Sequence, residues 1–140
     1  MKRLLVLLIT ITLISPALAT SEARVTLVSA EAAGGPLRIV DFPLVWPSPF
    51  SPARQDDVVI QYTLSEDADI DMIIVSSGGE IIKKMSFQKG EPGGKGELNK
   101  VVWDGLREFG RPLANGIYLG IIMSRSHNKV LGNFKLTAYN

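Results

Sequence analysis

The sequence predicts an all-β sandwich, and three observations lead to that fold class. About seven short runs place apolar residues at every second position or in brief apolar blocks, which is the pattern of β-strands. Clusters of Gly, Pro, Asn and Asp separate these runs at the intervals typical of a sandwich. Beyond the N-terminal segment, no stretch shows a convincing helical period.

The N-terminal segment has the features of a secretory signal peptide. Lys2 and Arg3 form a positive end, and Leu4–Ile14 is an apolar run too short to span a bilayer comfortably. Ala17–Ala19 supply the small residues of a cleavage site, so we expect residues 1–19 to be removed. The protein is therefore predicted to be exported, either to the periplasm or to the extracellular surface; an uncleaved anchor is the alternative.

Composition excludes several classes of partner and chemistry. Removing 19 of the 140 residues leaves 121; Lys+Arg falls from 15 to 13 against 14 Asp+Glu, and the net charge changes from +1 to −1. Such a charge does not predict nucleic-acid binding. The absence of cysteine excludes disulfides, thiol catalysis and cysteine-ligated metals, so the core must form by apolar packing. No second apolar run reaches membrane length, so no membrane span is expected after cleavage.

The chain after the signal divides into a lead and one domain. Residues 20–35 are predicted to be a partly flexible lead that contains one strand-like piece, VTLVS. Residues 36–140 are predicted to form the sandwich. Its first part carries prolines at positions 43, 47, 49 and 52, which lack an N–H group and favour polyproline or edge-strand backbone. Trp46 and Phe50 lie among these prolines as predicted apolar anchors.

The central runs predict three strands. Apolar residues alternate through Val58–Leu64 and again through Ile70–Ile74, with the two-residue period of a strand. Ser77–Glu80 forms a turn, and Ile81–Phe87 returns as the second strand of a hairpin. Residues 88–97 are rich in Gly and charged residues and predict a loop.

The last three strands are predicted at Leu98–Trp103, Ile117–Ser124 and Val130–Tyr139. The final strand is the expected edge of its sheet because it ends the chain. Gly132 interrupts it and predicts a bulge. The favoured interpretation is that this edge only completes the core; the alternative hypothesis is that it also borders a partner-binding surface, with Thr137 on the solvent face.

The connection between the predicted strands Leu98–Trp103 and Ile117–Ser124 has a dense pattern of turn residues. Trp103 ends a strand and is large enough to anchor the core. Asp104 and Gly105 suit a tight turn, because Asp bonds nearby backbone N–H groups and Gly accepts a positive φ.

Further turn signals lead into the next strand. Gly110 precedes Arg-Pro in a second turn, and Asn115-Gly116 reverses the chain. Tyr118 lies early in the following strand, where a sandwich can bury the ring and bond the hydroxyl to a nearby corner.

The order of these motifs resembles the immunoglobulin-like domain first defined in flagellar hook-capping proteins, the FlgD Ig-like family, which also occurs at the C-termini of secreted bacterial proteins. The resemblance implies an immunoglobulin/fibronectin III-like antiparallel β-sandwich of about seven strands, without catalytic residues. It covers roughly Phe42–Tyr139, although the first motif lacks the Asn that the family commonly has beside its prolines. The matching residues are Pro47, Pro49, Phe50, Pro52, Tyr62, Leu64, Gly79, Trp103, Asp104, Gly105, Gly110, Asn115, Gly116 and Tyr118.

Three candidate chemical motifs have simpler structural interpretations. Asp67, Asp69 and Asp71 alternate like the start of a calcium loop, but Met72 and Gly78 stand where such a loop needs Gly and Glu. On a strand these carboxylates would share the solvent face. The run GEPGGKGE lacks the spacing of a phosphate-binding loop.

His127, the only histidine, lies in a polar turn without a partner cluster, so a Ser-His-Asp site is not supported. We therefore expect no catalytic, cofactor-binding or metal-binding residues and no enzyme activity.

Three functions from different classes follow from these observations. The first is an exported, non-catalytic binding or assembly module of the bacterial envelope or cell surface, with an unidentified protein partner there. The alternative is a C-terminal-type sorting or attachment domain like those of type IX secretion, which is weakened because no cargo precedes the domain. An enzyme is the third.

Overall fold

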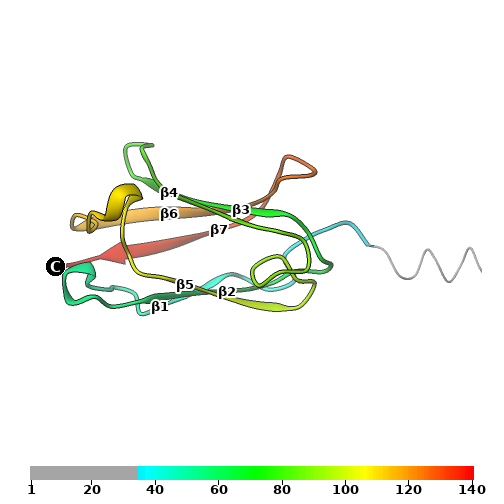
Figure 1. Cartoon of the computed structure of the whole chain (residues 1–140), viewed down its shortest axis with the longest axis horizontal. Coiled ribbons are helices and arrows are strands. Elements are labelled where there is room, and N and C mark those ends of the chain that lie inside the picture. The colour runs from blue at the N-terminus through cyan, green and yellow to red at the C-terminus, as the bar shows by residue number, and fades with distance from the viewer. Residues whose placement is uncertain (1–34) are drawn as a thin grey trace, which may run out of the picture. The chain divides into compact units, whose positions relative to one another are not determined.

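The computed structural model describes residues 35–140, in which Leu37–Asn140 form one compact unit. Two antiparallel sheets pack face to face, which confirms the predicted β-sandwich (Figure 1). The predicted signal peptide and all but the last residue of the predicted lead, including VTLVS, lie outside the described residues. Within the described part there is no helix long and apolar enough to cross a membrane.

Seven strands and two short 3-10 turns make up the described fold. The first sheet has the order β1-β2-β5 and the second has the order β4-β3-β6-β7. The elements are β1 (Leu44–Trp46), η1 (Pro52–Arg54), β2 (Val58–Thr63), β3 (Ile70–Ser76), β4 (Ile81–Phe87), β5 (Leu98–Trp103), η2 (Glu108–Gly110), β6 (Gly116–Ser124) and β7 (Lys129–Ala138). Strands β2 to β7 match the sequence prediction to within one or two residues at each end, and β1 is an edge strand within the proline-rich run.

The core lies between the sheets because the strands alternate as the sequence predicts. Val58, Ile60 and Tyr62 of β2 are buried, and Val59 and its alternating neighbours face away from the core. β3 contributes Ile70, Met72 and Ile74 in the same way. Each such side chain stabilises the fold by about 1.5–3 kcal/mol relative to an exposed position.

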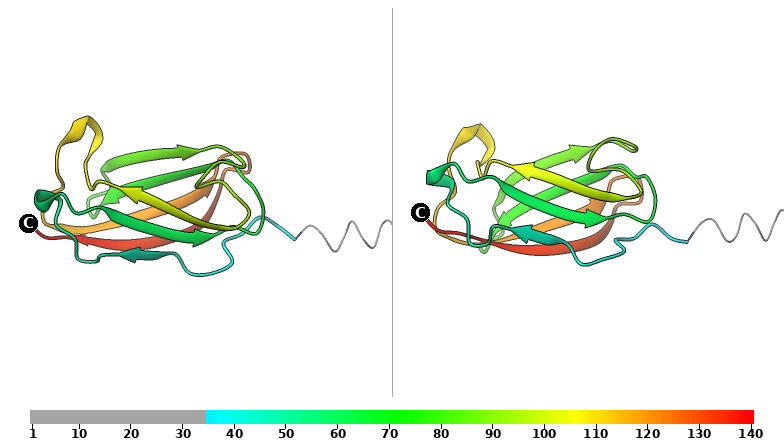
Figure 2. Two further views of the ribbon diagram at one scale, coloured as in Figure 1. Left: turned by 60° about the horizontal axis from the view of Figure 1, so that its bottom comes forward. Right: turned by 90° about the horizontal axis from the view of Figure 1, so that it is seen from below.

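The two sheets are unequal, and one side of the sandwich is open as a result. Four strands pack over three, and in Figure 2 β4 extends beyond the edge of β5. The inner face of β4 is therefore only partly covered: Lys83, Met85 and Phe87 are half-buried. We call the region between the outer edges of β4 and β5 the open side.

The opposite side is closed by the segment that leads into β2. The Phe50 N–H group donates to the carbonyl of Thr137 (3.0 Å), and the Tyr139 N–H group donates to the carbonyl of Phe50 (2.9 Å). Gly132 lies directly beneath Ile39, because a Cβ built on Gly132 would lie 2.8 Å from the Ile39 side chain.

These contacts change the interpretation of the last strand. β7 is the edge of its sheet, as predicted, and the register with β6 shifts between Ile122 and Met123, which leaves Leu131 as the extra residue beside Gly132. However, Thr137 is half-buried and its carbonyl is already bonded. The main chain of β7 therefore offers little free edge at its C-terminal end.

A compact corner joins the two sheets where β5 ends. Trp103 is buried and its indole N–H group donates to the carbonyl of Leu106 (3.0 Å). The rings of Trp103 and Phe50 lie 6.0 Å apart between centroids. Gly105 has a φ of 68°, and a Cβ there would lie 2.5 Å from the Phe50 ring, so both backbone and space require glycine.

Trp46 corrects the expectation of two apolar anchors in the proline-rich run. Phe50 is buried, but Trp46 is 40% exposed on the outer face of β1. β1 places alternate residues on opposite faces, and it is Val45 that packs toward the core.

We predict that Trp103→Ala destabilises the protein by about 3–5 kcal/mol, because it empties a large buried volume at this corner. Chemical denaturation measures the free energy of unfolding. Val102→Ala, at an exposed neighbour on the same strand, serves as control and should change stability little. Equal effects of the two variants would mean that the Trp103 ring does not stabilise the core.

Candidate functional site

The nine residues predicted to form the structural motif lie in the segments at one end of the sandwich. Ring packing and hydrogen bonds hold most of these segments in place. Phe50, Trp103 and Gly105 form the corner described above, and Asp104 accepts a hydrogen bond there from the Leu106 N–H group (3.0 Å). Pro49 is exposed beside this corner. The remaining four are Gly110, Asn115, Gly116 and Tyr118.

Those four hold the connection from β5 to β6. The Tyr118 hydroxyl donates to the carbonyl of Ala114 (2.9 Å), and Asn115 Oδ1 accepts a hydrogen bond from the Asn140 N–H group (2.7 Å). Gly110 adopts a φ of 73° at the end of η2, and Gly116 begins β6. These contacts position loops, and none of them assembles a reactive group.

Asp71 is the most constrained carboxylate on the four-stranded sheet. It is only 6% exposed and accepts hydrogen bonds from the Ser86 hydroxyl (2.7 Å) and Arg125 Nε (3.1 Å), while Lys84 Nζ lies 3.1 Å away. Burial raises the pKa of this carboxyl, but the bonds from Ser86, Lys84 and Arg125 outweigh it and hold the pKa below its ordinary value.

The other two aspartates of the DADID run serve different segments. Asp67 accepts a hydrogen bond from the Gly96 N–H group (2.6 Å), and Asp69 accepts one from the Lys89 N–H group (2.9 Å). The strand pattern predicted that the three carboxylates share one solvent face, and this is wrong. β3 begins only at Ile70, so Asp67 and Asp69 precede the strand. Across residues 35–140, no three His, Cys, Asp or Glu side chains gather into a group that could hold a metal ion.

His127 does have partners, contrary to the sequence expectation, but they are those of a turn. Its Nδ1 lies 3.1 Å from both the Ser124 and the Ser126 hydroxyls. Ser124 is fully buried, and its hydroxyl also accepts a hydrogen bond from the His127 N–H group (3.3 Å). A nucleophile must reach its substrate, so this buried hydroxyl fits a local turn contact better than catalysis.

The glycine-rich loop is fixed against the core by two buried polar side chains. The Tyr62 hydroxyl donates to the carbonyl of Gly93 (2.7 Å), and its burial raises the pKa of the phenol. Asn99 Oδ1 accepts hydrogen bonds from the N–H groups of Gly93 (2.9 Å) and Lys95 (3.3 Å). The loop amides that a phosphate would need are thus already bonded within the chain.

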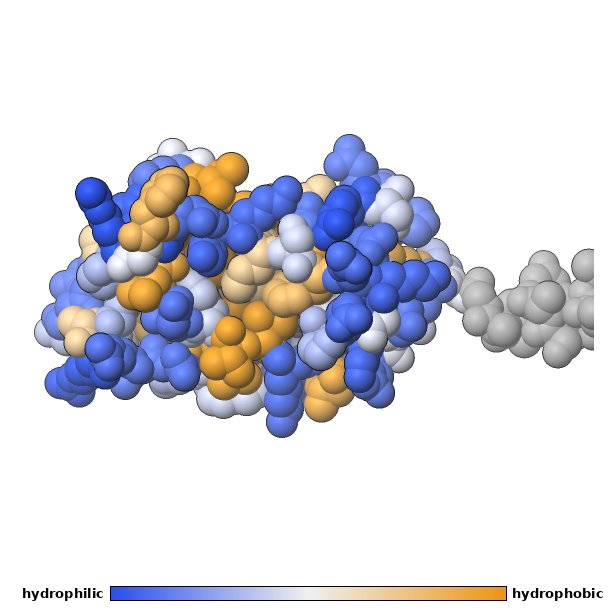
Figure 3. All heavy atoms as spheres, in the orientation of Figure 1, coloured by the Kyte–Doolittle hydropathy of each residue, from blue (hydrophilic) through white to orange (hydrophobic). Residues whose placement is uncertain are grey.

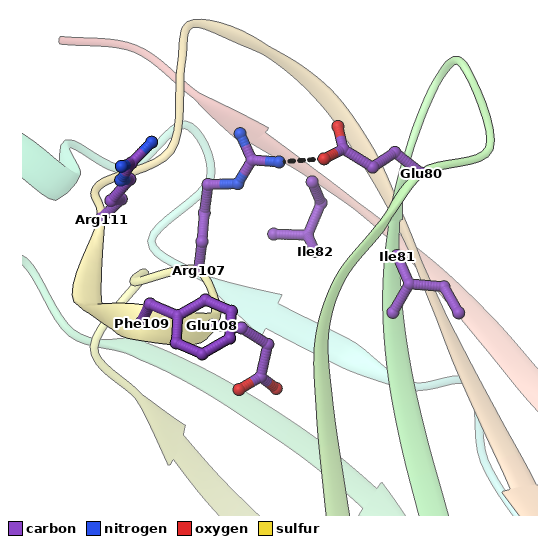
Figure 4. Close-up of a pocket in the computed structure, with 7 residues that line it drawn as sticks. All are labelled: Glu80, Ile81, Ile82, Arg107, Glu108, Phe109 and Arg111. Carbon is purple, nitrogen blue, oxygen red and sulfur yellow. Dashed lines mark hydrogen bonds and ion pairs between the residues drawn. The ribbon is translucent and has the colours of Figure 1, made fainter.

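A groove of about 510 Å³ lies beside the open side, between β4 and η2 (Figure 4). Phe109 stands at the tip of η2 and is 99% exposed, with a φ of 68° that is unfavourable for a residue other than glycine. The groove is lined by Glu80, Ile81, Ile82, Arg107, Glu108, Phe109 and Arg111.

Polar contacts tie this loop to β4. Arg107 forms an ion pair with Glu80, as Figure 4 shows. Glu108 accepts a hydrogen bond from the Lys84 N–H group (3.3 Å) and lies 3.8 Å from Lys83 Nζ. Phe109 is therefore presented on an anchored loop. The sequence alone does not identify Phe109 as a candidate site residue. The only signal in the sequence is an aromatic residue placed between charged residues and a glycine.

A second groove of about 670 Å³ lies between the segment leading into β1 and the start of β7. Phe42 is 92% exposed there, with Val40 and Leu44 on either side of it, both about half exposed. Both grooves combine apolar side chains with an exposed aromatic residue.

Comparisons with known proteins bear on the fold. No protein-family model and no curated protein matches the chain. Dimeric latent PorU from Porphyromonas gingivalis is similar over 75% of this chain and 10% of its own, at 15% identity and a TM-score of 0.55. PorZ, described as an essential surface component of the type-IX secretion system of P. gingivalis, is similar over 70% of this chain and 11% of its own (17% identity, TM-score 0.48).

An immunoglobulin-like protein of Pseudomonas aeruginosa is similar over 75% of this chain and 98% of its own, at 12% identity and a TM-score of 0.48. The chain spans about a tenth of the two P. gingivalis proteins. At 15% identity the likeness to PorU concerns the fold alone. None of the three places the chain in the hook-capping family.

We predict that Asp71 makes stability depend on acid pH. Because its pKa is lower in the folded chain, the unfolded chain binds the proton first, so stability is present above the ordinary Asp pKa of about 3.9 and is lost as pH falls through the folded value. Asp71→Asn should lower stability at pH 7 and flatten this loss. Asp57→Asn, at an exposed position before β2, should keep the wild-type pH profile in denaturation experiments. Identical profiles for all three proteins would contradict the assignment.

Proposed function

We propose that the protein is an exported, non-catalytic binding module of the bacterial envelope or cell surface, which binds a partner protein with Phe109 and the groove beside it. The observation that carries this proposal is an exposed aromatic side chain on a loop that several polar contacts hold in place.

The energetics of Phe109 support a binding role. Its backbone conformation costs on the order of 1–3 kcal/mol, and its ring gains nothing from the core of this chain. Burial of the ring against a partner would offset that cost. An aromatic anchor on a loop already held by Glu80 and Glu108 would also lose little conformational entropy on binding.

The proposed location rests on the predicted signal peptide, and the proposed family rests on the motif order from Pro47 to Tyr118. Membership of the hook-capping immunoglobulin-like family would imply an assembly or attachment role without catalysis. The immunoglobulin-like fold is consistent with that role, although fold alone does not assign function.

A sorting or attachment domain of the type IX kind is the second candidate. The fold is similar to that of PorU from P. gingivalis, and PorZ of the same organism is described as a type-IX component. This similarity favours the sorting domain as a second candidate. Fusing residues 36–140 to the C-terminus of a reporter enzyme, in a bacterium with that system, tests it. Reporter activity at the cell surface would support sorting; reporter retained in the periplasm would contradict it.

We predict that Phe109→Ser reduces capture of the partner at least tenfold, because loss of an aromatic anchor typically costs 2 kcal/mol or more, roughly a 30-fold change in affinity. The measurement is quantitative pull-down from envelope extract with the immobilised chain from Thr20. Phe42→Ser is the matched control, since it removes an equally exposed ring from the second groove. Equal capture by Phe109→Ser and the wild type would contradict the proposed site.

A further inference from the structure

β5 is the outer strand of the three-stranded sheet, and no main-chain hydrogen bond among the described residues covers its outer edge. β5 pairs along its whole length with β2 and has no second strand neighbour. The Leu64 N–H group donates to the carbonyl of Glu97 (3.2 Å), and this fixes which residues of β5 bond to β2. Because bonding alternates along an antiparallel pair, the main-chain groups of Leu98, Lys100 and Val102 point away from β2.

Each of the other edges is short, interrupted by a bulge or partly bonded. On β4, the Lys84 N–H group already donates to Glu108, and the register with β3 shifts at Ile74/Val75, which leaves Ile82 as the extra residue of a bulge. On β7, Phe50 bonds the C-terminal end. β1 has only three residues and is flanked by proline on both sides, at Pro43 and Pro47.

Among the described residues, the three-stranded sheet has no strand opposite β4 (Figure 2). A strand added next to β5 would lie opposite β4, which now extends past the three-stranded sheet (Figure 2). Its inward side chains would cover Met85 and Phe87, which are half-buried and pack on the core. Figure 3 looks onto this side and shows apolar side chains gathered in the band between the two sheets.

The outward side chains of β5 specify the chemistry of that strand. Leu98 is 51% exposed and Val102 is 61% exposed, and exposed Lys100 stands between them on the same face. A second copy added antiparallel, with its Leu98 opposite Val102, would place Lys100 opposite Lys100, and like charges directly opposite are destabilising. An acidic residue at that position would instead form a favourable cross-strand pair.

We propose that the free edge of β5 binds an extended strand of a partner protein, added antiparallel, in which an acidic residue faces Lys100 and apolar residues face Leu98 and Val102. This inference deepens the proposed function and rests on it: η2 follows β5 in the chain, so Phe109 and the added strand would contact the same partner.

The test uses synthetic peptides and the whole chain from Thr20. The probe has the central sequence Val-Ile-Glu-Ile-Val, flanked by Ser-Thr-Ser on each side, with Glu facing Lys100 and both Ile residues facing β4. One control peptide replaces Glu with Lys. A second control carries an N-methyl group on the Glu amide, which removes its main-chain hydrogen bond and keeps every side chain. Fluorescence anisotropy of labelled peptides measures the dissociation constants.

We expect the wild type to bind the Glu peptide roughly threefold to fivefold more tightly than the Lys peptide, as opposite charges across a strand pair allow. Lys100→Glu should reverse this preference. That variant should fold normally, because Lys100 is exposed and has no ion pair among the described residues. The N-methyl peptide should not bind measurably.

Three results would overturn the inference: no binding of the Glu peptide, equal binding of the N-methyl peptide, or an unchanged preference in Lys100→Glu. These outcomes are independent of the pull-down with Phe109→Ser. Loss of capture in that pull-down with no peptide binding would remove strand addition and leave the proposed function standing. Peptide binding together with normal capture by Phe109→Ser would contradict the Phe109 site and leave strand addition to β5 standing.

Discussion

Packing a sheet of four strands on a sheet of three is the constraint on which most features of this molecule depend. A sandwich core is complete only where both layers are present, and here β4 extends past β5 (Figure 2). The inner side chains of β4 are half-buried as a consequence, and β5 keeps one unpaired edge. The loop that leaves β5 carries Phe109 to the same side. Exposed apolar groups and free main-chain groups are thus concentrated on one side of the domain.

On the opposite side of the sandwich, the C-terminal end of the β7 edge is covered by another segment of the chain. The proline-rich segment adds only the three-residue strand β1 to its sheet, but the main-chain groups of Phe50 bond to β7 and its ring packs with Trp103. Gly105 allows that ring to approach the chain closely. With no cysteine available, this aromatic corner and the alternating core of β2 and β3 hold the sheets together. The contrast between a covered edge and an open edge favours a binding role for the open one.

Much of this fold could be predicted from the sequence, because strand period and turn chemistry are local properties. The alternation in β2, the hairpin of β3 and β4, and the positive φ of Gly105 follow from neighbouring residues alone. The partners of Asp71 could not be predicted, since Lys84 lies on β4 and Arg125 follows the end of β6. The exposure of Phe109 and Trp46 could not be predicted either, nor could the position of the open edge on β5. These features depend on which strands pair within each sheet and how the two sheets pack.

Amide hydrogen exchange of the chain from Thr20, followed residue by residue by NMR, tests the central claim that β5 has an open edge. The N–H groups of Asn99 and Val101 bond to β2 in the observed register and should be strongly protected. Those of Lys100 and Val102 point outward and should exchange fast, giving an alternating pattern along one strand. Uniform protection of residues 99–102 would show that this edge is covered in the free protein and would contradict the account.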